Sequence, residues 1–352
     1  MCVLALNVNI CCILEYKMQR IVKLKSDVFF TSYSAVGGGE ESRGRYGKAF
    51  DLCDESDMFG MPTFELAEGE MGRCAMNLAL GKAGLSHGDI DLLVAGDLQN
   101  QCSASSVGLN SFDIPFLGIY GACSTCTEGL LIAASMMEAD ASTARCAVVT
   151  SSHNSAAERQ FRTPLEYGGQ RSGTAQWTAT AAGAFILGRD GGRVKLSELM
   201  AGKVVSGETS DGANMGPAMA FAAADSIISY FDISGERPES FDYIVTGDLG
   251  KYGSLVLEDI LSEKYPSAAR RHVDCGMLLY NGTDQDVHAG ASGCGTSAAL
   301  LALEFLPALE RGDVKNLLFL STGALMNPSS LLQGSVIYGV APLIHLESMA
   351  KT

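Results

Sequence analysis

The sequence predicts an α/β fold made of two duplicated halves, each with parallel strands joined by crossover helices. Apolar strand-like runs alternate with longer helical patterns, which is typical of a parallel sheet whose strands are buried on both faces. The chain of 352 residues contains 40 glycines and only 18% charged residues, as expected of a large core with many tight turns. The third observation is an internal repeat at one constant spacing. The repeated pairs are Cys123 and Cys294, Thr125 and Thr296, and Leu130 and Leu301.

Each half is predicted to run strand, turn, helix, strand. The first strands are the apolar run 92–95 and the run that ends at residue 246, and both are followed by Gly-Asp-Leu, at 96–98 and 247–249. A helix then begins near each cysteine of the repeat, and a second apolar strand follows at 147–149 and at 318–320. The second half has a longer segment, "RRHVDCGMLLYNGTDQDVHAG", before its cysteine. We expect this insertion to form a wall of the site or a partner-docking loop.

Three segments are expected along the chain. Residues 1–17 are an apolar extension, non-native or disordered, since an ordinary first strand and loop follow Met18; a short membrane-contacting segment is the alternative. Residues 18–190 form the N-terminal half and residues 191–352 the C-terminal half.

Charge and cysteine usage limit the classes of partner. The formal net charge is −15, which leaves no basic stripe for a phosphate backbone, so no nucleic acid is expected. The 11 cysteines show no paired spacing, which favours a reducing, intracellular compartment. No apolar run reaches the roughly 20 residues that span a bilayer, so the chain is expected to be cytoplasmic or peripheral on a membrane.

Cys123 lies where an enzyme presents a nucleophile, in "IYGACSTCTEGLLIAAS", at the start of a helix after a buried run. With the duplication, this resembles the thiolase and ketoacyl-synthase superfamily. The resemblance implies a thiolase-like fold of layers αβαβα about a pseudo-twofold axis, and commonly a homodimer. It also implies an acylated thiol at Cys123, with a His and an Asn from the second half that stabilise developing charge.

The chain departs from the synthase pattern at both partners of the thiol. Gly247, followed by Asp248, stands at the place of the synthase His, and Gly295 stands at the place of the Asn. Losing one oxyanion donor costs about 100-fold to 1000-fold in rate. We therefore interpret Cys123 as a degenerate nucleophile in a site without catalytic residues, and expect no enzyme activity. His153, His272 and His288 leave room for residual acyl transfer.

Longer strings resemble the stage V sporulation protein AD family: "PFLGIYGACST", "TSSHNSAAERQFRTPLEYGGQ", "TGDLGKYGS" and "HVDCGMLLY". This resemblance implies non-enzymatic binding of pyridine-2,6-dicarboxylate (dipicolinate) for uptake into the developing spore. It further implies membrane-embedded channel proteins of the same system as partners, and a location at the inner membrane of the forespore or spore. No resident cofactor is expected; calcium is either carried with the ligand or bound by the protein.

The predicted ligand residues are Cys123, His153, Asn154, Arg159, Arg162, Asp248 and His272. Four of them follow the strand that ends near Thr150, at the sheet edge where α/β proteins bind ligands. Guanidinium groups suit the two carboxylates of a planar ligand. The alternative for Arg159 and Arg162 is an ion pair with Glu158 or Glu166 that braces a dimer.

Two other functions stay open. One is a ketoacyl-synthase III-like condensing enzyme that acts on acyl-CoA thioesters through Cys123, and the other is an assembly protein with an empty pocket. His272, Asp274 and Cys275 lack a second cluster at ligand spacing, so no metal site is predicted.

Overall fold

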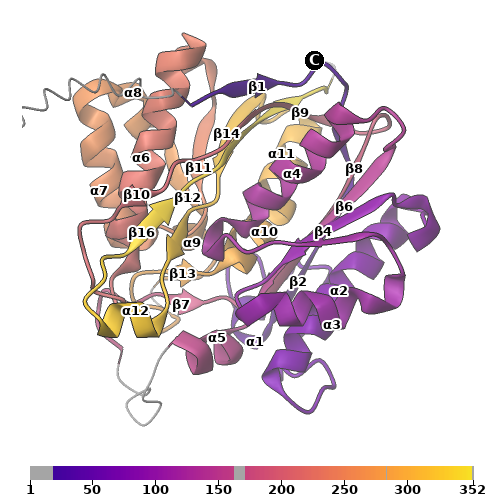
Figure 1. The fold of residues 1–352 in the computed structure, drawn as a ribbon, viewed down its shortest axis with the longest axis horizontal. Helices are drawn as coiled ribbons and strands as arrows, with labels where there is room; N and C mark the ends of the chain where they lie inside the picture. The colour runs from indigo at the N-terminus through magenta and orange to yellow at the C-terminus, as the bar shows by residue number, and fades with distance from the viewer. Residues whose placement is uncertain (1–18, 162–170, 283, 351–352) are drawn as a thin grey trace, which may run out of the picture.

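The computed structural model describes residues 19–161, 171–282 and 284–350. Within these ranges one sheet has the order β12-β11-β14-β17-β9-β2-β8-β6-β4-β5, with β1 beside β9 and β3 beside β2 (Figure 1). Its strands are β1 (Ile21–Lys23), β2 (Phe29–Gly38), β3 (Leu52–Asp54), β4 (Leu92–Gly96), β5 (Phe116–Gly118), β6 (Arg145–Ser152), β8 (Ala181–Gly188), β9 (Val194–Met200), β11 (Tyr243–Thr246), β12 (His272–Asp274), β14 (Asn316–Leu320) and β17 (Leu343–Ser348).

Two smaller sheets and the helices complete the fold. The small sheets are β10-β16-β15, formed by β10 (Val205–Ser206), β15 (Gly323–Leu325) and β16 (Tyr338–Val340), and the pair β7 (Trp177–Thr178) with β13 (Ala291–Ser292). The α-helices are α1 (Gly39–Ser42), α2 (Phe64–Ala83), α3 (Ser103–Leu109), α4 (Thr125–Ala139), α5 (Asn154–Phe161), α6 (Met215–Ser234), α7 (Gly250–Lys264), α8 (Pro266–Ala269), α9 (Cys275–Leu278), α10 (Cys294–Leu300), α11 (Leu306–Arg311) and α12 (Pro328–Leu332).

The order of the large sheet repeats itself on the two sides of the contact between β2 and β9. β4 pairs in parallel with β5 and β6, just as β11 pairs in parallel with β12 and β14. β6 and β14 then pair antiparallel with β8 and β17, which in turn pair antiparallel with β2 and β9. The predicted duplication of an α/β unit is therefore confirmed.

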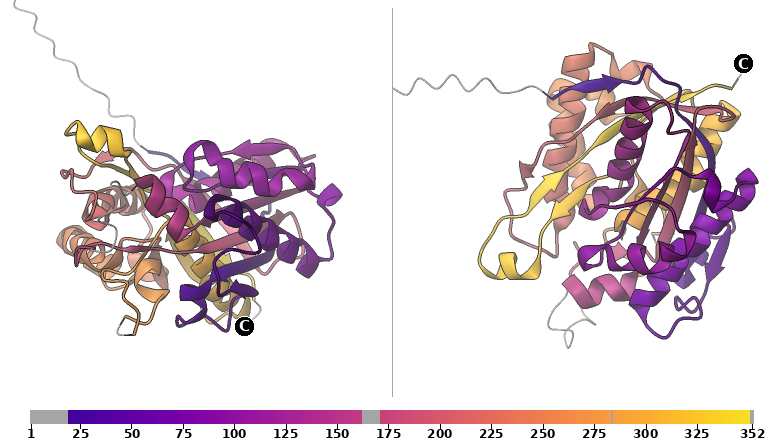
Figure 2. Two further views of the ribbon diagram at one scale, coloured as in Figure 1. Left: turned by 90° about the horizontal axis from the view of Figure 1, so that it is seen from below. Right: turned by 45° about the vertical axis from the view of Figure 1, so that its right-hand side comes forward.

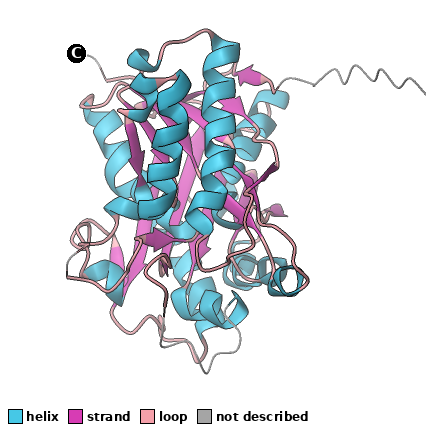
Figure 3. Cartoon of the chain, turned by 90° about the vertical axis from the view of Figure 1, so that its left-hand side faces the viewer, coloured by secondary structure: helices cyan, strands magenta, loops and turns pink. Residues whose placement is uncertain are grey.

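The helices form outer and central layers. α2 and α3 lie at one side and α6 to α8 at the other, where they stand in front of the strands when that side is viewed (Figures 1 and 3). α4, α10 and α11 lie between them, and their side chains belong to one hydrophobic cluster with strands of both halves. Each outer helical layer has its own cluster with the strands it covers. Figure 2 shows the same layers from two further directions.

The elements of the repeat lie where the sequence predicts them. β4, α4 and β6 form the first copy, and β11, α10 and β14 the second. A Cβ atom added to Gly129 would lie 2.8 Å from Val148 Cγ1, so this glycine allows α4 to approach β6 closely. The expectations for residues 1–17 and for Arg162 fall outside the described ranges.

Candidate ligand-binding site

A cavity of about 290 Å³ lies in front of Cys123. Its walls come from the turn before α4, from α5, from the segment around β7, from the start of α6 and from the segment between β15 and α12. The lining residues are Leu98, Tyr120, Ala122, Cys123, Ala157, Glu158, Phe161, Ala175, Gln176, Thr178, Gly212, Ala213, Met215, Ser292, Ala324, Met326 and Leu331. Of the predicted ligand residues that the structure describes, only Cys123 is in this lining, and Asp248 is hydrogen-bonded to its thiol.

Cys123 lies in a 3₁₀ turn, Ala122–Ser124, that leads into α4. Ala122 has φ of 53°, a left-handed conformation that is costly for a residue with a Cβ atom. Ser124 Oγ and Thr125 Oγ1 donate to the carbonyls of Gly121 and Ala122, at 2.6 Å each, and fix this turn. The turn leaves Cys123 6% exposed at the inner end of the cavity.

Asp248 is the closest acidic partner of the thiol. Its carboxylate accepts from the Gly293 backbone N–H at 2.8 Å and from Thr322 Oγ1 at 3.0 Å, and it is hydrogen-bonded to the Cys123 thiol. Burial raises the pKa of Asp248 to about 7. Burial and then the Asp248 carboxylate raise the pKa of the Cys123 thiol well above its usual range. Since the thiolate is the nucleophilic form, this environment disfavours reaction at Cys123.

The two glycines at the positions matched to the synthase His and Asn differ in the space around them. A Cβ atom on Gly295 would lie 2.2 Å from the Ala181 carbonyl oxygen, so an asparagine there requires the backbone to move. A Cβ atom on Gly247 would lie 3.0 Å from Ser321 Cα, a tight contact that a shift of a few tenths of an ångström relieves.

The structure does not bring His153, Asn154 and Arg159 into the cavity lining. His153 is fully buried, and its Nε2 lies 2.8 Å from the Asp57 carbonyl oxygen. Asn154 Nδ2 donates to the Thr178 carbonyl at 3.1 Å. Arg159 Nη1 lies 3.4 Å from Glu65 Oε1 of α2, an ion pair that the sequence did not predict, and Glu166 falls outside the described ranges.

His272 likewise points into the protein. Its Nδ1 lies 3.1 Å from Glu258 Oε1 and its Nε2 2.8 Å from Thr246 Oγ1, while the side chain is 1% exposed. Thr246 donates to Asp274, whose carboxylate also accepts from the backbone N–H groups of Leu249 and Gly250. This network holds the turn that carries Asp248, and His272 itself is not among the described residues that line the cavity.

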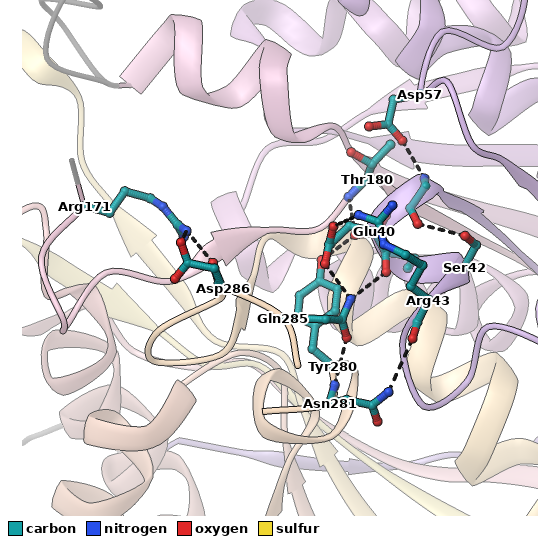
Figure 4. A network of polar contacts seen from close by, with 12 residues as sticks. Glu40, Ser42, Arg43, Asp57, Arg171, Thr180, Tyr280, Asn281, Gln285 and Asp286 are labelled. Atoms are coloured by element: carbon teal, nitrogen blue, oxygen red, sulfur yellow. Dashed lines mark hydrogen bonds and ion pairs between the residues drawn. The ribbon is translucent and has the colours of Figure 1, made fainter. Parts of the chain in front are cut away.

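The second-half insertion packs on the first half and contributes nothing to the cavity lining within the described residues. Tyr280 donates to the buried Glu41 carboxylate, which also accepts from the Thr180 backbone N–H at 3.0 Å. Gln285 Nε2 donates to the Glu40 carbonyl at 2.8 Å (Figure 4). The insertion thus joins the two halves, and the expected site wall is formed by other segments.

Because Glu41 is buried, we expect it to make the free energy of unfolding depend on pH. Burial raises the pKa of Glu41 to about 7, whereas an unfolded Glu titrates near 4.3. The folded state therefore binds the extra proton, and the free energy of unfolding falls as pH rises from about 5 to 7. We expect Glu41→Gln to remove a slope of roughly 1 kcal/mol per pH unit, measured by urea unfolding at several pH values. The exposed Glu263→Gln is the control, and an unchanged slope in Glu41→Gln would refute this assignment.

Several residues of the cavity wall have no feature in the sequence that would predict their place in the site. Gln176 Nε2 donates to the carbonyls of Asp248 and Ala291, at 2.8 and 2.7 Å, and ties β7 to the Asp248 turn. Gly212, Ala213 and Met215 bring the N-terminus of α6 to the cavity. These residues are dispersed along the chain, and only the fold assembles them.

Two absences concern the described part of the chain. It contains no group of three or more His, Cys, Asp and Glu residues placed to hold a metal ion. None of its helices is both long and apolar enough to cross a membrane.

Several solved structures resemble this one. A variant of OleA from Xanthomonas campestris matches with a TM-score of 0.58 and 14% identity, covering 93% of this chain and all of that one. A tetronic acid condensing enzyme matches with a TM-score of 0.59 and 15% identity, over 91% of this chain and all of that one. 3-Oxoacyl-[acyl-carrier-protein] synthase III from Aquifex aeolicus VF5 matches with a TM-score of 0.53 and 14% identity, over 90% and 99%. These likenesses show the thiolase-like fold.

Sequence comparison is more specific. The stage V sporulation protein AD of Bacillus subtilis (strain 168) is 37% identical over 314 residues, which are 89% of this chain and 92% of that protein. The model of the family described as stage V sporulation protein AD matches residues 18–347. This chain, with its thiolase-like fold, therefore belongs to the stage V sporulation protein AD family.

Proposed function

We propose that this chain binds dipicolinate, free or as its calcium chelate, in the cavity in front of Cys123, and performs no chemistry on it. The observation that carries the proposal is an open cavity that ends at a thiol with a raised pKa, beside two glycines in place of catalytic side chains. Binding serves uptake of the ligand into the developing spore, at the inner membrane of the forespore or spore. Membrane-embedded channel proteins are the proposed partners.

The walls suit a small planar aromatic ligand. The volume of about 290 Å³ is near the lower end of ordinary ligand pockets, about 300 Å³. Tyr120, Phe161 and Leu98 offer flat or apolar surface, and Thr178 and Ser292 offer hydroxyl groups. This combination of apolar walls and few polar groups is the usual composition of such sites.

Helix N-termini are the available groups for the carboxylates. The start of α6, at Gly212, Ala213 and Met215, and the turn that leads into α4 both line the cavity. Neither helix has a side-chain hydrogen bond at its N-cap, Asn214 or Ser124. Backbone N–H groups at a helix N-terminus favour an anion, by about 0.3–1 kcal/mol each at exposed sites.

Among the lining residues that the structure describes there is no Lys or Arg. A dianion gains no ion pair from these residues, whereas a calcium chelate carries its own compensating charge. This difference favours the calcium chelate over the free acid as the tighter ligand.

The test is a calorimetric titration with dipicolinate, with and without calcium. We expect saturable binding of one ligand per chain, tighter with calcium. Benzene-1,3-dicarboxylate, which has the same two carboxylates but no ring nitrogen to chelate the ion, should bind at least about 10-fold more weakly, a difference of roughly 1.4 kcal/mol. The absence of heat with dipicolinate in either condition would refute the proposal.

Arg159→Ala tests whether Arg159 binds the ligand, as the sequence predicts, or lies outside the cavity, as the structure indicates. Because Arg159 is 3.4 Å from Glu65 and outside the cavity lining, we expect its removal to change the dissociation constant less than about threefold. The same titration measures this change. A loss of binding would place Arg159 at the ligand after all.

We also propose a homodimer through the edge strand β5. All three of its residues are exposed, including Phe116 and Leu117, and Val107 and Met136 expose further apolar surface. A second copy that pairs antiparallel with β5 covers this edge, as unpaired edges require. Light scattering should give twice the mass of the chain, and Leu117→Glu should give the single mass. A monomeric wild-type chain at micromolar concentration would contradict this proposal.

A further inference from the structure

Gln176 is a buried amide in the wall of the cavity, directly before β7, and it is 9% exposed. Gln176 and Thr178 both line the cavity, whereas Trp177 between them does not, as expected of alternate residues in an extended chain. β7 pairs with β13, and the Trp177 backbone N–H donates to the Gly290 carbonyl at 2.9 Å. The paired backbone therefore presents Gln176 to the cavity in a fixed position.

The hydrogen bonds of Gln176 determine which end of its amide is free. Nε2 uses both of its hydrogens, on the carbonyl oxygens of Asp248 at 2.8 Å and of Ala291 at 2.7 Å. The reverse orientation would set the amide oxygen against these two carbonyls and is therefore excluded. Among the described residues Oε1 accepts no hydrogen bond, and it does not belong to their buried atoms without a partner. Oε1 is thus an unused acceptor that the cavity can reach.

The groups around this oxygen are acceptors as well. Ser292, which lines the cavity, donates its hydroxyl to the Asp248 carboxylate at 3.3 Å and so keeps its own lone pairs for a ligand. Burial raises the pKa of Asp248 to about 7, so this carboxyl is negatively charged in a large share of molecules at neutral pH. No Lys or Arg is among the described lining residues. This end of the cavity therefore attracts a cation and repels a carboxylate.

We propose that Gln176 Oε1 binds the calcium ion of the dipicolinate chelate and thereby selects the chelate over the free acid. This inference rests on the proposed function and adds the contact that determines which form of the ligand binds. Calcium takes about 6 to 8 ligands, and amide carbonyl oxygens and waters are common among them. Dipicolinate offers the ion two carboxylate oxygens and the ring nitrogen, so waters fill the remaining positions. Gln176 Oε1 replaces one of these waters.

One side-chain oxygen is sufficient because the ligand brings most of the other donor atoms. The site then needs no group of three His, Cys, Asp or Glu side chains, and the described part of the chain contains none. In this arrangement the ion faces Gln176, and the carboxylates are directed away from it, toward the start of α6. The amide oxygen and the two carboxylates thus avoid one another.

Gln176→Lys distinguishes ion binding from a structural role. The ammonium group keeps donors for the carbonyls of Asp248 and Ala291 but offers no acceptor to the cavity. By calorimetric titration, we expect the dissociation constant for calcium dipicolinate to rise at least about 10-fold. The constant for dipicolinate in excess EGTA should stay equal or fall. A loss of affinity for both forms, or for neither, in a variant with the wild-type melting temperature would overturn the inference.

Terbium luminescence reports the contact itself. Tb³⁺ replaces calcium in the chelate, dipicolinate sensitises its emission, and each bound water shortens the emission lifetime, so lifetimes in H₂O and D₂O count the waters on the ion. The protein is kept in excess over an equimolar mixture of Tb³⁺ and dipicolinate. We expect the wild-type complex to hold one water fewer than the complex of Gln176→Met, whose side chain has similar length and no oxygen. Equal water counts in the two complexes would overturn the inference.

Failure of this inference and failure of the proposed function give different results. If the wild type binds neither dipicolinate nor its calcium chelate, the proposed function is wrong, and this inference is wrong with it. If the wild type binds the chelate while Gln176→Lys retains the same preference for it, only the role of Gln176 is wrong. The ion then faces another part of the cavity.

Discussion

Ala213→Trp is expected to weaken dipicolinate binding at least about 100-fold, which is roughly 2.7 kcal/mol. Ala213 lines the cavity directly before α6 while it is itself exposed. An indole at this position fills part of the proposed ligand cavity and places bulk at the helix N-terminus proposed to face the carboxylates. The added ring disturbs no buried packing, so the melting temperature should change little. Calorimetric titration with and without calcium measures the effect.

The matched control is Ala141→Trp, at an exposed alanine after α4 that lies outside the cavity lining. It adds the same surface area and should bind dipicolinate as the wild type does. If Ala213→Trp binds with wild-type affinity, the ligand occupies another place and the cavity has been assigned wrongly. If both variants lose binding while they stay folded, the effect of the tryptophan is not local.

Asp248→Asn is expected to make Cys123 more reactive. The carboxylate of Asp248 is the second contribution, after burial, to the raised pKa of the thiol. A nearby opposite or like charge commonly shifts a pKa by one to three units, so removing it should speed alkylation by iodoacetamide about 10-fold or more. The effect should be largest above pH 7, because the pKa of Asp248 is about 7 and its carboxylate is charged there.

Peptide mapping by mass spectrometry follows Cys123 separately from the ten other cysteines. Asp97→Asn is the control, because Asp97 is the corresponding residue of the first Gly-Asp-Leu and accepts from Ser105 rather than from Cys123. Its alkylation rate at Cys123 should equal that of the wild type. A wild-type Cys123 that already reacts as fast as an exposed thiol would refute the protonated state assigned to it.

The duplicated architecture was predictable because it depends on a periodic signal. Apolar strands buried on both faces and a cysteine at the same place in each copy specify β4-α4-β6 and β11-α10-β14 without tertiary information. The turn at Cys123 was also predictable. An apolar run ends at Gly121 and a helical pattern begins directly afterwards, so the chain must turn at Cys123.

The side chains that line the cavity were not predictable in the same way. His153 and Arg159 lie in one short segment of the sequence, but the structure sends them to different partners. Arg159 pairs with Glu65, and His153 is buried against the Asp57 carbonyl. Charge and sequence proximity do not determine which face of a helix borders a cavity. The walls at Ala213 and Leu331 carry small or apolar side chains that are common everywhere, so only their tertiary placement marks them.

The central claim is that a catalytic site has become a binding cavity whose thiol does not react. The most direct test is the intact mass of the protein after incubation with acyl-CoA thioesters at pH 7 to 8. The account predicts an unchanged mass, because the Cys123 thiol stays protonated and lacks the synthase His and Asn. An acyl adduct on the wild type that is lost in Cys123→Ser would contradict the account and favour a condensing enzyme.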